Sequence, residues 1–71
     1  MSDASIKRLD EFSAPYGKEV ILEDVNYESG LCLLRIRIRE GNRFTIMDID
    51  TETARHWGSA MLAWADRTTS A

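Results

Sequence analysis

Hydrophobic and polar residues alternate most regularly at residues 34–39, where the order is Leu, Arg, Ile, Arg, Ile, Arg. A period of two places alternate side chains on opposite faces of a β-strand, so these arginines share one face. Neighbouring segments rich in Val, Ile, Tyr and Phe are separated by the turn signals Ser29-Gly30 and Gly41-Asn42. The pattern predicts a three-stranded antiparallel meander, with strands at about 19–28, 31–40 and 43–49.

The period becomes helical after residue 50, where Ala54, Trp57, Met61 and Trp64 recur at helical spacing. The pattern predicts a helix at about 51–67 packed on one sheet face, followed by a frayed tail at 68–71. The chain is therefore expected to be a single α+β domain over residues 1–71.

The N-terminal residues 1–16 have a different pattern, with Ile6, Leu9 and Phe12 spaced three apart. This spacing predicts a short helical segment that can pack on the sheet. Ala14-Pro15 ends it, because the residue before a proline disfavours helical geometry.

The strand register follows from the turns if both are two-residue loops. One sheet face is then almost wholly apolar, and the helix is expected to cover it with its large side chains. The expected core consists of Val25, Leu34, Ile36, Ile38, Met47, Ile49, Trp57, Met61 and Trp64.

The same register places Arg35 between Asp24 and Asp48, one acid on each neighbouring strand. Opposite charges directly across a sheet attract, so these three residues are expected to form a structural ion ladder. Around it the face mixes apolar residues with two further arginines, and such a surface suits an interaction. The candidate interaction face consists of Val20, Leu22, Leu33, Arg37, Arg39, Phe44 and Ile46.

Three occupants could cover that face: the N-terminal segment, a second copy of the chain, or a different partner or ligand. The leading hypothesis is therefore a non-enzymatic interaction module that self-associates as a homodimer or binds another protein through the arginine-bearing face. The alternative is single-stranded nucleic acid or nucleotide binding there, since sheet-face binders combine cationic and aromatic residues. A net charge of −3 and a pI near 5.0 argue against nucleic acid and anionic membranes.

No residue pattern favours an enzyme, a cofactor or a metal. His56 faces away from the apolar stripe, and the run Asp48-x-Asp50-x-Glu52 lacks the glycine of a calcium loop. Cys32 is the single cysteine, is expected to be a buried small hydrophobe, and has no internal disulfide partner. The chain has neither a secretory signal pattern nor an apolar run of about 20 residues that could span a bilayer, so we expect a cytoplasmic protein.

Several short motifs between Pro15 and Ala65 suggest a family. They are Pro15-Tyr16-Gly17, Leu22-Glu23-Asp24-Val25, Tyr27-Glu28-Ser29-Gly30, Leu33-Leu34-Arg35, Arg43-Phe44-Thr45-Ile46, Trp57-Gly58 and Ala63-Trp64-Ala65. In these the chain resembles a family of small uncharacterised bacterial proteins. The resemblance implies a domain of unknown function and no mechanism.

Overall fold

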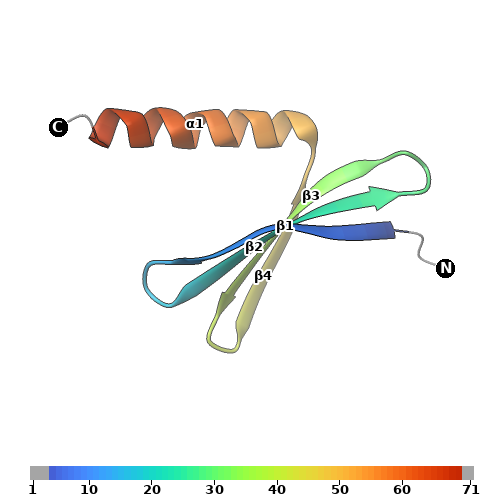
Figure 1. Ribbon diagram of the computed structural model, residues 1–71, viewed down its shortest axis with the longest axis horizontal. Helices are drawn as coiled ribbons and strands as arrows, with labels where there is room; N and C mark the ends of the chain where they lie inside the picture. The colour runs from blue at the N-terminus through green and yellow to red at the C-terminus, as the bar shows by residue number, and fades with distance from the viewer. Residues whose placement is uncertain (1–3, 70–71) are drawn as a thin grey trace.

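The computed structural model describes residues 4–69 as a four-stranded antiparallel sheet followed by one helix (Figure 1). The predictions for residues 1–3 and 70–71 lie outside the described residues, whereas Thr68 and Thr69, predicted to fray, are the last residues of the helix. The strands lie in chain order across the sheet. The elements are β1 (Ala4–Ala14), β2 (Lys18–Tyr27), β3 (Cys32–Glu40), β4 (Arg43–Ile49) and α1 (Thr51–Thr69).

The predicted α+β class is confirmed, but the predicted N-terminal helical segment is wrong. Residues 4–14 form β1, which pairs along its length with β2 at the edge of the sheet. The register shifts between Arg8 and Asp10, so Leu9 is the extra residue of a bulge. That extra residue explains the misleading pattern: Ile6 and Phe12 lie opposite Val25 and Val20, on different faces of one strand.

The β3–β4 hairpin has the predicted two-residue loop. Glu40 pairs with Arg43, and Gly41 between them has a φ of 62°. A glycine with positive φ at the first loop position is typical of a type II′ turn, whose twist matches that of the strands. The predicted pairing of Arg35 with Asp48 follows from this loop and is confirmed.

The β2–β3 hairpin differs from the prediction by one residue. Its loop is Glu28-Ser29-Gly30, closed by the bonds from Tyr27 N to Leu31 O and from Gly30 N to Tyr27 O, each 2.9 Å long. Gly30 has a φ of 96°, as expected where a turn ends in a left-handed residue. Because one extra loop residue moves every side chain of β2 to the other face, Arg35 lies opposite Glu23 rather than Asp24.

The corrected register divides the sheet into two chemically different faces. What we call the apolar face consists of Phe12, Val20, Leu22, Leu34, Ile36, Ile38, Met47 and Ile49. What we call the ionic face carries Arg8, Glu11, Glu19, Glu23, Arg35, Arg37, Arg39 and Asp48. Val25 was expected among the core residues under the helix, but it lies on the ionic face between Ile6 and Leu33.

Helix α1 leaves the sheet directly after β4 and extends away from it (Figure 1). Its main contacts within the chain are with β3. The expectation that α1 buries its large side chains on the sheet is wrong for the single chain, because Trp57, Met61 and Trp64 are 39%, 58% and 60% exposed. Met47 is exposed as well, whereas Val25 and Ile49 are buried.

A substitution at Gly30 tests the three-residue loop. An added Cβ would meet no atom within 4 Å, so the cost of Gly30→Ala is the backbone strain of a left-handed residue. We expect Gly30→Ala to lower the free energy of unfolding by about 1–2 kcal/mol, measured by urea denaturation. Ser29→Ala in the same loop is the control and leaves the midpoint nearly unchanged. An unchanged midpoint for Gly30→Ala would contradict this loop.

Candidate functional site

The most distinctive feature of the chain is a cavity between α1 and the apolar face, which we call the wedge. It has a volume of about 380 Å³, is partly open to solvent, and its lining is almost entirely apolar. Such a space inside a folded domain would normally be filled by side chains. The lining residues are Phe12, Val20, Leu22, Leu34, Ile36, Ile38, Ile49, Ala54, Trp57, Gly58 and Met61.

Helix α1 is joined to the sheet at the junction between β4 and α1, where Asp50 is the single connecting residue. Its carboxylate Oδ1 accepts a hydrogen bond from the backbone N–H of Thr53 at 2.8 Å, and its carbonyl accepts one from Ala54 N at 2.9 Å. These bonds make Asp50 the N-cap of α1. Hydrogen bonds from the side chain and backbone of Thr53 also hold the pKa of Asp50 below its usual value. The cap marks where the helix begins, and the residue just before it, Ile49, is buried.

The side of α1 that borders the wedge carries both tryptophans and Met61, whereas Leu62 lies outside this row, which we call the helix stripe. The stripe consists of Ala54, Trp57, Met61, Trp64 and Ala65, at the spacing of one helix face. The helix has 19 residues and is therefore about 28 Å long. Only its first half, through Met61, lines the wedge, so Trp64 lies beyond the sheet contacts. Two indole rings in partial contact with water are an unusual surface for a lone domain.

The ionic face is a network of charge pairs within the chain. Arg35 binds Asp48 through two hydrogen bonds, Nε–Oδ1 at 2.9 Å and Nη2–Oδ2 at 3.2 Å. Two further arginines of β3 reach carboxylates of β2: Arg39 Nη2 lies 2.6 Å from Glu19 Oε1, and Arg37 Nη1 lies 3.5 Å from Glu23 Oε2.

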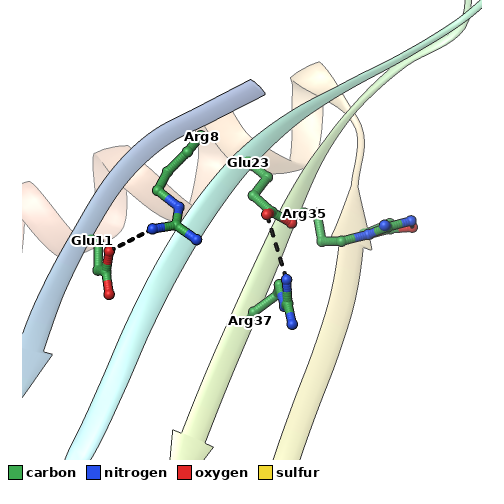
Figure 2. Close-up of polar contacts among 6 residues, drawn as sticks. Arg8, Glu11, Glu23, Arg35 and Arg37 are labelled. Atoms are coloured by element: carbon green, nitrogen blue, oxygen red, sulfur yellow. Dashed lines mark hydrogen bonds and ion pairs between the residues drawn. The ribbon is translucent and has the colours of Figure 1, made fainter. Parts of the chain in front are cut away.

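An arginine of β1 extends this network: Arg8 Nη1 donates to Glu11 Oε1 at 2.8 Å. Figure 2 shows that pair beside the contact between Glu23 and Arg37. Four arginines thus stand beside four carboxylates, and the ionic face has no formal net charge.

The structure divides the expected interaction face between the two sides of the sheet. Leu33, Arg37, Arg39, Phe44 and Ile46 lie on the ionic side, and Phe44 and Ile46 are each 58% exposed. Val20 and Leu22 lie on the apolar face and line the wedge. Asp24 also lies on the apolar side. The residue of β2 opposite Arg35 is therefore Glu23, which is buried, and not Asp24.

The residues considered for catalysis or metal binding either have structural roles or lie apart from one another. Asp48 pairs with Arg35 and Asp50 caps α1, while His56 is exposed on the helix. Cys32 was expected to be buried, but it lies exposed beside the hairpin loop, where Sγ donates to the carbonyl of Gly30 at 3.7 Å. Within residues 4–69 no three His, Cys, Asp or Glu side chains are grouped as metal ligands would be.

Fold and surface together define the class: a small α+β protein whose antiparallel meander is only partly covered by its own helix. Comparison with family models identifies the family of the chain. It belongs to a family of unknown function, DUF6967, whose model matches residues 3–67. Searches of curated proteins and of solved structures find no match to the chain. Among the described residues, no helix has the length and apolarity needed to cross a membrane.

The Arg35–Asp48 pair predicts a pH-dependent contribution to stability. The hydrogen bond from Arg35 is the main cause that lowers the pKa of Asp48 below its usual 3.8. A carboxyl with a lowered pKa in the folded state stabilises the fold above its unfolded value, and this contribution disappears as the pH falls through the folded pKa.

We therefore expect Asp48→Asn to lower the thermal midpoint at pH 7, with the difference from the parent chain shrinking below the usual range of aspartate. Asp24→Asn is the matched control, because Asp24 lies on the face opposite Arg35. A larger loss for Asp24→Asn than for Asp48→Asn would contradict the register described above.

Proposed function

We propose that this chain is a non-enzymatic protein-interaction module that works by self-association, with the wedge and the helix stripe as its binding surface. The observation that carries the proposal is the wedge itself, an unfilled apolar space bordered by partly exposed tryptophans. Covering such a surface removes apolar area from water, which is the main driving force of association.

The large exposed area and the extended shape of the chain support the binding of a partner. A compact protein of 8.1 kDa has an accessible surface of about 4,500 Å², whereas this chain exposes 5833 Å². Its radius of gyration is 14.4 Å, against about 11 Å for a compact domain of 71 residues. The helix that projects from the sheet accounts for this extended shape. A second molecule would add apolar burial that the small interior of this chain does not provide.

The ionic face favours a protein surface over nucleic acid, the alternative function. Binding to phosphates needs cations whose charge is not already neutralised. Arg35, Arg37 and Arg39 each have a carboxylate partner on a neighbouring strand. The proposed module is cytoplasmic, for which a single cysteine without a disulfide is suitable.

Sedimentation equilibrium of the purified chain tests the proposal. We expect a mass of twice 8.1 kDa at micromolar concentration, falling toward the mass of one chain on dilution. The control is the same measurement at high salt, where association driven by apolar burial persists. A mass of one chain at every concentration, up to the solubility limit, would overturn self-association.

A further inference from the structure

We propose that two copies associate around a two-fold axis, with the helix stripe of each copy lying on the apolar face of the other. This inference rests on the proposed self-association and specifies its geometry. Each site is incomplete in one chain: the sheet lacks a cover over Phe12 and Val20, and the helix lacks a surface for Trp64.

In each chain the helix stripe and the apolar face are both incompletely covered. Each of these two surfaces is suited in shape to pack against the other. The helix stripe is a narrow ridge of two indoles and a methionine, whereas the apolar face is a broad sheet surface with branched side chains. In a two-fold dimer every contact between the two copies occurs twice. The stripe of the first copy therefore packs on the sheet of the second, and the stripe of the second packs on the sheet of the first. A second copy therefore covers both surfaces at once, with equal areas.

The area that one chain leaves open matches a stable dimer. The exposed surface exceeds that of a compact protein of this mass by about 1,300 Å². Two copies would then bury about 2,600 Å² in total, which lies in the range of obligate homodimers. Those interfaces are also the more apolar ones, as this surface is.

The distribution of charge on the two surfaces is also compatible with the two-fold dimer. The charged residues that share the apolar side of the sheet are three cations and three anions, and the helix stripe carries none. Two identical surfaces of this kind do not repel each other, and a strongly basic or acidic partner would gain little from them. These charged residues are Lys7, Lys18 and Arg43 with Asp10, Asp24 and Glu40.

The junction at Asp50 favours a second copy over closure of the wedge by the chain's own helix. In the structure α1 begins one residue after β4, and Ile49 is buried at this junction. Closing the wedge with the chain's own helix would require a change of backbone angles beside this buried side chain. A partner's stripe can cover the apolar face without that change.

Charged substitutions on the two faces test the geometry. Trp64→Glu places a carboxylate in the stripe at a side chain that is 60% exposed, so the single chain should still fold. We expect it to raise the dimer dissociation constant at least about 30-fold, as loss of a central hot-spot residue does. Phe44→Glu is the matched control on the ionic side, at 58% exposure, and Ser59→Glu is the control for a new charge on α1. Both controls should leave the constant nearly unchanged, and circular dichroism checks that each variant folds.

The outcomes separate the geometry from the proposed function. A dimer that is lost in Trp64→Glu and kept in Phe44→Glu and Ser59→Glu supports the exchanged arrangement. A dimer that is lost in Phe44→Glu and kept in Trp64→Glu overturns it and makes the ionic side the interface. A dimer kept in all three variants also overturns it, and the exposed edge of β4 then becomes the place of contact. A parent chain that is monomeric overturns both the geometry and self-association.

If Trp64→Glu fails to fold, Met61→Gln provides the second test. Met61 is 58% exposed and lies on the same stripe, and glutamine keeps a similar length and helix propensity. A weakened dimer for Met61→Gln supports the exchanged helices, and an unchanged dissociation constant overturns them.

Discussion

The N-cap at Asp50 is the contact on which the rest of this structure depends. One residue connects β4 to α1, and its side chain and carbonyl bind the first turn of the helix. Ile49 is buried immediately before the cap, and α1 leaves the sheet from this point. The wedge, the exposed indoles and the extended shape all follow from that direction. In a chain of 71 residues such an arrangement leaves apolar surface of the sheet and of the helix in contact with water.

The two faces of the sheet divide stability and interaction between them. On the ionic face, cross-strand pairs such as Arg35 with Asp48 favour this strand register and neutralise the charge of the arginines. Exposed pairs of this kind add little free energy individually, so they specify the pairing of strands more than they stabilise the fold. The apolar face provides the larger driving force, but only when something lies on it. If the chain is the interaction module proposed above, the same contact would supply both its stability and its function.

Local signals predicted part of this fold, and the failures have physical causes. The Gly41 hairpin, the start of α1 and the Arg35–Asp48 pair were predictable because each depends on residues close in sequence. The loop at Gly30 fits either two or three residues, and that difference moved Val20 and Leu22 to the other face. The bulge at Leu9 produced a spacing of three that imitates a helix. Helical periodicity identified the stripe of Trp57 and Trp64 but predicted it to be buried on the chain's own sheet, because periodicity does not specify the angle at which a helix leaves a sheet.

Tryptophan fluorescence during dilution tests the central claim most directly, since both indoles of the chain lie on the helix stripe. If a second copy covers the stripe, emission at high concentration is that of indoles in an apolar environment. It then shifts to longer wavelength on dilution, with the same midpoint as the change in mass. Emission of solvated indoles at every concentration, or a shift that does not follow the mass, would contradict the account.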